Sequence, residues 1–459
     1  MQNWLEFQAV VMAAGKGSRI PEMTATKPKC LLPVGNKPMI YYPLKLLENA
    51  GFRDTKIIVA DNYASDIQEE VDNLGFEMNL SFVPIPSDED WGTADSLRHI
   101  SDYILTDVII LSCDLVTDVD LHQVLNIYRN NNASLVSLYF SPSQDEQCIF
   151  TVPGLKSKIK FEKDIIGYDS KTSRLLLMAS ASDYEETMPI SSSLLNKCSN
   201  LTLSSKLLDS HMYIMKRWLV NYLIKDVNIS TLKGELLPFV VKKQLTKHCK
   251  KIELNEKSVE DEENEKPDIF NILKESDIEA NIRSMSSFGN LSNFEEIIKC
   301  YACVIDSNIG IRANTLYDYC RINKTIHKLN INLGDEKDKI SPEAEILSNQ
   351  FDKESCSVGP NTKIMEKTSI KSSTIGSRCT INSKTRITDC ILMNGVTIEE
   401  RCVLQNCIVC HDAVISAGCE LKDCLISGNF KVPSGGNLYK INYNNNLYNL
   451  LYITYLPFI

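Results

Sequence analysis

The sequence predicts an α/β domain with a mainly parallel sheet, followed by a parallel β-helix. Two observations predict this order. The first 245 or so residues alternate short apolar runs with longer amphipathic segments, and from about residue 358 a 17-residue repeat takes over. With 459 residues the chain is long enough for two to four domains, because a domain holds roughly 100–200 residues.

The N-terminal α/β domain is predicted from its apolar runs. Residues 9–14 (AVVMAA), 56–60 (KIIVA) and 108–113 (VIILSC) each form the short run that is typical of a buried strand. Residues 39–50 lie between the first two runs and carry leucines at helical spacing. Continuous apolar strands separated by helices indicate a parallel sheet that helices cover on both faces.

The middle of the chain carries an acidic segment at residues 255–268 (NEKSVEDEENEKPD). It has almost no apolar residues, so we interpret it as a flexible loop that cannot bury enough surface to order itself. Partner binding is the less favoured alternative for this charge run. We therefore divide the chain into four parts. Residues 1–245 form the α/β domain, 246–345 an acidic insertion with a helical connector, 346–428 a β-helix and 429–459 an atypical tail.

The C-terminal repeat is regular in register. Four apolar positions recur at 17-residue intervals, and further apolar positions follow them after five and after eleven residues. A repeat this short with β-branched residues every five or six positions is typical of a solenoid, in which each coil packs on the next. The three short sides of each coil resemble the left-handed β-helix of hexapeptide-repeat proteins. The predicted core residues are Ile370, Ile387, Leu404 and Leu421 on one side, with Ile381, Ile398 and Ile415 on a second.

The repeat is expected to stop near Gly428. The tail that follows is rich in Asn, Tyr and Leu and ends in YNLLYITYLPFI, which fits neither the solenoid nor an amphipathic helix. About a dozen apolar residues are too few to span a bilayer. We expect the β-helix to be incomplete, and comparison of transcript with genome tests whether splicing or read-through produced this C-terminus.

Composition narrows the function classes. The formal net charge of −10 argues against nonspecific nucleic-acid binding, which needs a basic face, so no direct nucleic-acid partner is expected. The N-terminus lacks the basic start and apolar core of a secretory signal. No run of about 18 apolar residues predicts a membrane span. We expect a cytosolic protein in which the sixteen cysteines are reduced thiols.

One cysteine pair has a spacing that needs an interpretation. Cys407, Cys410 and His411 form a CxxCH string, which is also the spacing of haem attachment and redox motifs. Cys407 shares its repeat column with Cys390 and Cys424, a position that favours small side chains inside a narrow coil. We therefore interpret the string as structural, and no Cys/His group has a convincing zinc spacing.

A glycine-rich loop follows the first predicted strand. Gly15 and Gly17 allow close approach of the backbone to an anion, and the N–H groups of such a loop can hold phosphate. Ser18 and Arg19 follow, and Arg19 adds a cation with a two-pronged donor geometry. The alternative is a tight strand-to-helix turn in which Arg19 makes a structural ion pair.

The wider motif resembles the sugar-1-phosphate nucleotidyltransferases. The stretch AAGKGSRIPEMTATKPKCLLPVGNKPMIYYPLKLLENAGF is similar to their signature, and the resemblance places Lys29 at the lysine that contacts phosphate. Gly92, Thr93 and Ala94 resemble the GTA motif that lies against the base. Asp114 falls at a metal-binding aspartate, although it also suits a cap of a following helix. Active members need cations on the phosphates and carboxylates on magnesium.

The second carboxylate of that family is doubtful in this chain. The best match for its DxG segment is SNIG at residues 307–310, where Asn308 replaces the aspartate. An amide is a poorer magnesium ligand than a carboxylate, so no catalytic residue is assigned and Asp114 is left as a possible metal ligand. The alternative function is an active sugar-1-phosphate nucleotidyltransferase, similar to mannose-1-phosphate guanylyltransferases.

Longer runs resemble a noncatalytic family, the gamma subunits of translation initiation factor 2B. The similar runs are WGTADSLRHI, VIILSCDLVTDVDLHQVL, DIIGYDS and ELLPFVVKKQ. The resemblance implies a regulatory or scaffolding subunit of the complex that exchanges GDP for GTP on initiation factor 2. It implies the epsilon subunit as first partner, and then the alpha, beta and delta subunits. No cofactor is required by this function, and residual nucleotide or Mg²⁺ binding is left open.

Overall fold

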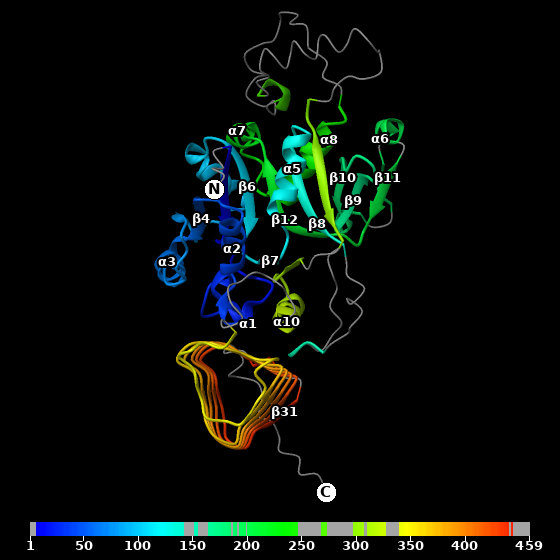
Figure 1. Cartoon of the computed structure of the whole chain (residues 1–459). Coiled ribbons are helices and arrows are strands. Elements are labelled where there is room, and N and C mark those ends of the chain that lie inside the picture. Colours follow the sequence, from blue (N-terminus) through cyan, green and yellow to red (C-terminus); the bar gives the residue numbers. More distant parts are fainter. Residues whose placement is uncertain are drawn as a thin grey trace, which may run out of the picture.

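The computed structural model describes most of the chain, in two parts that stand one above the other (Figure 1). The described residues are 6–141, 151–154, 164–184, 187–190, 192–198, 200–246, 268–272, 297–306, 310–326, 339–439 and 442–443. The prediction of an α/β domain followed by a parallel β-helix is confirmed. No helix among these residues is long and apolar enough to cross a membrane.

A seven-stranded sheet forms the centre of the α/β domain. Its order is β13-β8-β12-β6-β1-β4-β5, and every neighbouring pair is parallel except those that β12 makes with β6 and β8. The mainly parallel sheet is therefore confirmed. The strands are β1 (Phe7–Met12), β4 (Asp54–Ala60), β5 (Asn79–Ile85), β6 (Asp107–Ser112), β8 (Leu135–Phe140), β12 (Leu208–Met215) and β13 (Cys300–Ile305).

Helices cover both faces of this sheet, because successive side chains of a strand point to opposite faces. One hydrophobic core lies under α2 (Tyr41–Asn49), α3 (Ala64–Asp72) and α5 (Leu121–Asn130). A second core lies under α4 (Thr93–His99), α7 (Arg217–Lys225) and α8 (Leu237–Lys243). Smaller elements include α1 (Pro21–Thr24), α6 (Ser192–Lys197), the hairpin β2 (Pro33–Val34) and β3 (Lys37–Pro38), and a sheet of β9 (Asp164–Asp169), β10 (Leu175–Ser180) and β11 (Leu201–Ser204).

The predicted boundary of this domain at residue 245 is wrong. Strand β13 lies 55 residues further along the chain and completes one edge of the main sheet, paired in parallel with β8. Strand β14 (Gly310–Arg312) pairs with β7 (Leu115–Thr117), and α10 (Leu316–Thr325) follows it. The α/β domain therefore takes residues that we assigned to the connector. The acidic segment lies outside the described residues except for Asp268.

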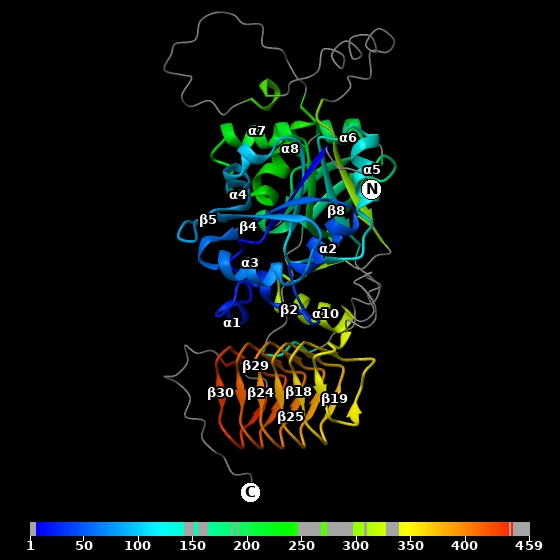
Figure 2. The same cartoon turned by 60° about the vertical axis from the view of Figure 1, so that its left-hand side comes forward.

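Three six-stranded parallel sheets form the β-helix, which is seen from the side in Figure 2. Each strand pairs with the strand 17 to 19 residues later, as Ile370 does with Ile387 and Ile387 with Leu404. All seven predicted core residues are buried. The first sheet contains β15 (Glu345–Ile346), β18 (Lys363–Ile364), β21 (Thr380–Ile381), β24 (Thr397–Ile398), β27 (Val414–Ile415) and β30 (Lys431–Val432). The second contains β16 (Gln350–Phe351), β19 (Ser369–Lys371), β22 (Arg386–Thr388), β25 (Val403–Gln405), β28 (Glu420–Lys422) and β31 (Asn437–Tyr439). The third contains β17 (Ser357–Val358), β20 (Thr374–Ile375), β23 (Ile391–Leu392), β26 (Ile408–Val409), β29 (Leu425–Ile426) and β32 (Asn442–Tyr443).

The corners of the coils explain why the repeat is so strict. Each coil turns three times, and from residue 361 onward each described corner places one residue at positive φ, where Gly, Asn and Asp are favoured. These residues recur at 17-residue intervals, so a single insertion would move a side chain into a strained conformation. The three columns are Asn361, Arg378, Gly395, Asp412 and Asn429; Lys367, Lys384, Arg401, Gly418 and Gly435; and Ser372, Asp389, Asn406 and Asp423.

The predicted end of the β-helix at Gly428 is wrong. Strands β30, β31 and β32 add a further coil, and each pairs in parallel with the strand before it. Val432, Leu438 and Tyr443 continue the columns of Ile415, Leu421 and Ile426, 17 residues later. The 17-residue spacing of apolar residues is therefore kept in this coil, although the segment is rich in Asn and Tyr. Residues 444–459 lie outside the described part of the chain.

The two parts of the molecule share a hydrophobic core. Outward side chains of the third β-helix sheet, among them Ile391, Ile408 and Leu425, pack with Met23 and Tyr319 of the α/β domain. The hydroxyl of Tyr319 also donates to the carbonyl of Pro33, at 2.5 Å. Buried apolar contact of this kind fixes the orientation of the two parts. It leaves the first and second β-helix sheets facing away from the domain.

Candidate functional site

A buried ion-pair cluster is centred on Asp114, between β6 and β7. The Nζ of Lys29 lies 2.5 Å from Oδ2 of Asp114. Arg312 of β14 reaches both oxygens, since its Nε lies 3.1 Å from Oδ1 and its Nη2 lies 3.1 Å from Oδ2. Lys29 also donates to Oδ1 of Asn314, at 2.9 Å. The carboxylate of Asp114 is thus held by two cations of the same chain, and only 1% of the residue is exposed.

The pKa values of this cluster follow from burial and charge. Burial by itself would raise the pKa of Asp114, but the charges of Arg312 and Lys29 and their hydrogen bonds hold it well below its usual range. Burial would lower the pKa of Arg312, and the charge of Asp114 outweighs burial and raises it. Asp114 therefore stays ionised and Arg312 stays charged at neutral pH.

Asp114 does not cap a helix, so that expectation is wrong. Strand β7 follows Asp114 directly, and the side chain accepts from Lys29 and Arg312 instead. The cap of α5 is Asp120, whose Oδ1 accepts from the backbone N–H of His122. The geometry also leaves Asp114 poorly suited to a metal, because a metal would have to displace two cations. No group of three or more His, Cys, Asp or Glu side chains suited to a metal occurs in the described residues, and Asn308 lies outside them.

The glycine loop is held by structural contacts. Gly17 has φ +70°, and a Cβ added there would lie 2.6 Å from Cγ2 of Thr24. A Cβ at Gly15 would meet nothing within 4 Å, because Gly15 faces an open cleft. Ser18 and Arg19 are exposed in the turn that leads to α1. Gly17 therefore has a conformational role, whereas Gly15 has space for a bound group beside it.

A cleft of about 500 Å³ lies beside this loop, at the carboxyl ends of β1, β4 and β5. Among the described residues that line it, Lys16 is the only Lys or Arg, and its Nζ lies 2.7 Å from Oδ1 of Asp90. Arg19 and Lys29 do not line the cleft. The structure therefore does not bring the predicted phosphate-binding cations together around one space.

The Gly92-Thr93 motif packs against the chain itself. A Cβ at Gly92 would lie 2.1 Å from the carbonyl oxygen of Ser230, so only glycine allows this approach. The same carbonyl accepts from the N–H of Ala94 at 2.9 Å, and Oγ1 of Thr93 accepts from the N–H of Leu232 at 2.9 Å. These contacts give both residues a structural role that the sequence motif alone did not reveal.

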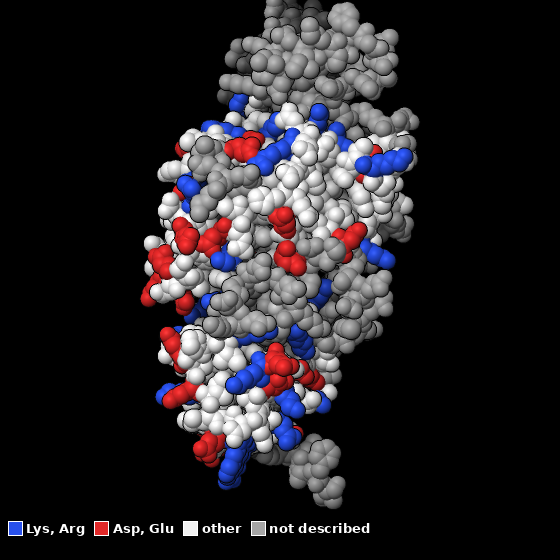
Figure 3. Space-filling model, in the orientation of Figure 1, with Lys and Arg blue, Asp and Glu red and all other residues white. Residues whose placement is uncertain are grey.

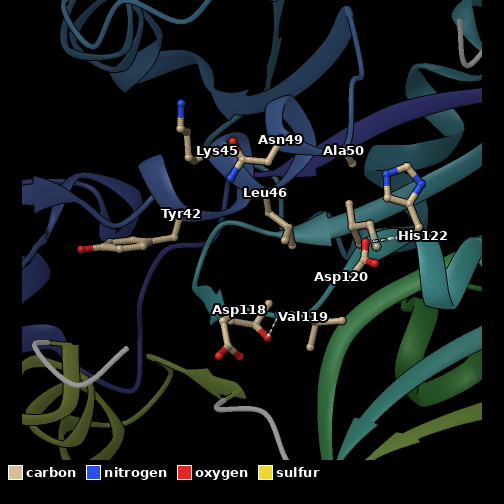
Figure 4. A pocket seen from close by; sticks show the side chains of 11 residues that line it. Tyr42, Lys45, Leu46, Asn49, Ala50, Asp118, Val119, Asp120 and His122 are labelled. Atoms are coloured by element: carbon tan, nitrogen blue, oxygen red, sulfur yellow. Dashed lines mark hydrogen bonds between the residues drawn. The ribbon is translucent and has the colours of Figure 1, made fainter. Parts of the chain in front are cut away.

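A smaller pocket of about 150 Å³ lies between α2 and the loop before α5 (Figure 4). Lys45 and Asn49 come from α2, and Asp118 and Asp120 come from the opposite wall. Nζ of Lys45 lies 2.7 Å from Oε2 of Glu48 on the same helix. This pocket is lined by both polar and apolar residues, and it is separate from the Asp114 cluster and from the larger cleft.

The sequence did not identify Arg312 and Asn314 as site residues. Arg312 is 198 positions from Asp114, and the contact depends on the pairing of β14 with β7. The sequence pattern that could have identified Arg312 is weak, because it is only a short apolar strand that ends in an arginine. Cys407, Cys410 and His411 of the CxxCH string are all buried. Cys407 lies in the core inside the coils, whereas Cys410 lies in the core that the β-helix shares with the α/β domain. The structural interpretation of the string agrees with the contact of Cys407, whose Sγ lies 3.2 Å from the carbonyl oxygen of Gln405.

Comparisons with known proteins match both parts of the chain. Residues 8–148 match the family model described as nucleotidyl transferase, and residues 341–438 match the one described as EIF2B subunit epsilon LbH domain. The chain is 31% identical over 382 residues to translation initiation factor eIF2B subunit gamma of Schizosaccharomyces pombe, which covers 81% of this chain and 73% of the relative. It is 26% identical to the eIF2B subunit gamma of Dictyostelium discoideum, over 80% of this chain and 87% of the relative. A mannose-1-phosphate guanyltransferase of Yarrowia lipolytica is 28% identical over 28% of this chain and 35% of its own length.

Proposed function

Because the chain belongs to the family of translation initiation factor eIF2B gamma subunits, we propose that it is a regulatory and scaffolding subunit of that factor and has no nucleotidyltransferase activity. The absence of transferase activity is proposed because Lys29 and Arg312 already form ion pairs with both carboxylate oxygens of Asp114. A transferase needs this carboxylate for a metal ion and needs its cations for phosphate. Here each group is neutralised by another group of the chain.

The cleft beside the glycine loop supports the same proposal. A bound triphosphate needs cations that face it, because isolated phosphate charges are costly to bury. Lys16, the one Lys or Arg in the described part of the lining, is paired with Asp90. Residual nucleotide or Mg²⁺ binding would have to break these pairs, so we propose that the subunit works without a cofactor.

The β-helix supplies the surfaces for assembly. Its first and second sheets face away from the α/β domain, and flat parallel sheets can pack against a like domain. The match of residues 341–438 to an epsilon-type domain supports the epsilon subunit as the first partner. In our proposal the alpha, beta and delta subunits and initiation factor 2 join the gamma–epsilon pair by contact, without any bond being made.

Affinity purification tests the assembly role. The tagged full chain, expressed in its native cells, should retain the epsilon subunit, and mass spectrometry of the bound chains identifies it. Failure to retain any initiation factor 2B subunit would contradict the proposal. The control is the same tag on an unrelated β-helix protein.

The alternative function, transfer to a sugar phosphate, has a direct assay. The chain is incubated with Mg²⁺, GTP and mannose 1-phosphate, and pyrophosphate release is compared with that of an Asp114→Asn variant. We expect no difference between the two proteins. Release by the natural chain that the variant lacks would establish the transferase and overturn the noncatalytic half of the proposal.

A further inference from the structure

The cleft beside the glycine loop is built to hold something other than phosphate. Its floor is apolar, with Ala13, Ile67 and Ile85 buried, and the partly buried rings of Tyr63 and Trp91 also line it. With about 500 Å³ it has room for several side chains of a peptide. An apolar floor favours the aliphatic part of a ligand.

The rim of this cleft is strongly acidic. Asp88, Glu89 and Asp90 line it from the loop after β5, and all three are exposed. Against these three carboxylates stands Lys16, which is already paired with Asp90. The cleft therefore has an excess of negative charge in the place where a phosphate-binding site needs positive charge.

The acidic character extends beyond the rim. Between Lys56 and Arg98 the chain has no Lys or Arg at all and ten Asp or Glu residues. Helix α3, which contributes Ile67 to the floor, carries four of these carboxylates. In Figure 3 acidic side chains gather on the flank where α3 lies in Figure 1. One-signed charge around a cleft raises the local concentration of oppositely charged ligands.

We propose that this cleft binds an extended, Lys- or Arg-bearing segment of a partner protein. The methylene stems of the basic side chains lie on the apolar floor, while their charged ends reach Asp88, Glu89 and Asp90. Trp91 and Tyr63 offer ring faces to the same cations. The inference goes beyond the assembly role, because it assigns a second docking site on the α/β domain, away from the β-helix.

Fluorescence titration tests the binding. The full chain is titrated with a short labelled peptide of alternating Lys and Ala, with a Glu-Ala peptide of the same length, and with GTP. We expect the basic peptide alone to bind and its affinity to fall steeply with added salt, since these charges are exposed and screened. It should also shift the emission of Trp91, and a Trp91→Phe variant should lose this shift.

Matched variants locate the site. The triple variant Asp88→Asn, Glu89→Gln and Asp90→Asn should weaken the basic peptide on the order of tenfold at low salt, because three exposed ion pairs are lost and Lys16 is released. The control removes the same number of exposed charges from the β-helix, and it should bind as the natural chain does. Its substitutions are Glu343→Gln, Glu354→Gln and Glu420→Gln. Thermal unfolding by circular dichroism shows that both variants fold.

Three outcomes would overturn the inference. They are undiminished binding by the cleft variant, equal loss in the β-helix control, and GTP binding that competes with the peptide. Normal retention of the epsilon subunit together with any of these results leaves the proposed function intact. Loss of the epsilon subunit with normal peptide binding would overturn the proposed function alone.

Discussion

Replacing Arg312 by methionine should strongly destabilise the α/β domain. The substitution keeps much of the side-chain volume but leaves Asp114, which is 1% exposed, with Lys29 as its one remaining cation. Removing one partner of a buried ion pair costs about 3–5 kcal/mol, because a charge is left without full compensation. The Arg312 side chain is 17% exposed and Lys29 remains, so we expect the lower end, about 3 kcal/mol.

Urea unfolding followed by tryptophan fluorescence measures this loss. The control is Lys363→Met, which breaks the exposed pair with Glu345 and should cost less than about 1 kcal/mol. Adding Asp114→Asn to the Arg312 variant should restore part of the stability, because the uncompensated charge is then gone. A cost for Arg312→Met no greater than that of the control would refute the account of a stabilising buried cluster.

The pH dependence of the cluster has a definite sign. The pKa of Asp114 is lower in the folded than in the unfolded protein, so folding is favoured while the carboxyl is ionised. This stabilisation is complete above the unfolded pKa of about 4 and is lost as the pH falls towards the lower folded pKa. The double variant without Arg312 and the Asp114 charge should lack this part of the acid sensitivity.

Three further changes test other parts of the fold. Gly17→Ala should lower stability by about 1–2 kcal/mol, because of the positive φ and the contact with Thr24, whereas Gly15→Ala should unfold at the temperature of the natural chain. Burial lowers the pKa of His411 to about 3, so between about pH 6.5 and pH 3 the unfolded chain takes up a proton that the folded ring does not. The free energy of unfolding should therefore fall as the pH is lowered through that window. Urea unfolding at pH 7 and at pH 5 should show a smaller loss of this free energy for His411→Gln than for the natural chain. Leu404→Asp puts a charge inside a coil, so it should unfold the β-helix and release the epsilon subunit. Val403→Asp, on the outside of the same strand, is the control and should preserve folding. Survival of epsilon binding in the Leu404 variant would exclude the β-helix as the interface.

The sequence predicted the elements whose signals are local. The apolar runs of β1, β4 and β6 identified buried strands, and the spacing of apolar residues at 17-residue intervals was enough to identify the coils. Strand β13 was missed because its run CYACVI lies beyond the acidic segment. No local sequence pattern predicts that this run pairs with β8 at the edge of the main sheet. The last coil was missed because its outward residues are Asn and Tyr, although Val432 and Leu438 keep the inward positions.

The site was harder to predict than the fold. Asp114 was identified as a candidate from the resemblance to the sugar-1-phosphate nucleotidyltransferases, but its pairing with Arg312 depends on a contact between residues far apart in the chain. The residue type did not predict that Arg312 is buried, since an arginine on a short strand is more often exposed than buried. The roles of Gly92 and Thr93 were hidden for the same reason, because both depend on the approach of the segment around Ser230.

The ion pairs within the chain help to explain why this fold can act by binding other proteins, without catalysis. A catalytic site keeps charged groups arranged for a ligand that is absent between turnovers, and that arrangement is held at a cost to stability. In this chain Lys29 and Arg312 are satisfied by Asp114, and Lys16 is satisfied by Asp90. The buried charges of Lys29 and Arg312, which would serve phosphate transfer, therefore stabilise the folded domain instead. The exposed carboxylates of the cleft rim and the outward β-helix sheets are left to interact with other molecules, and both are suited to binding proteins.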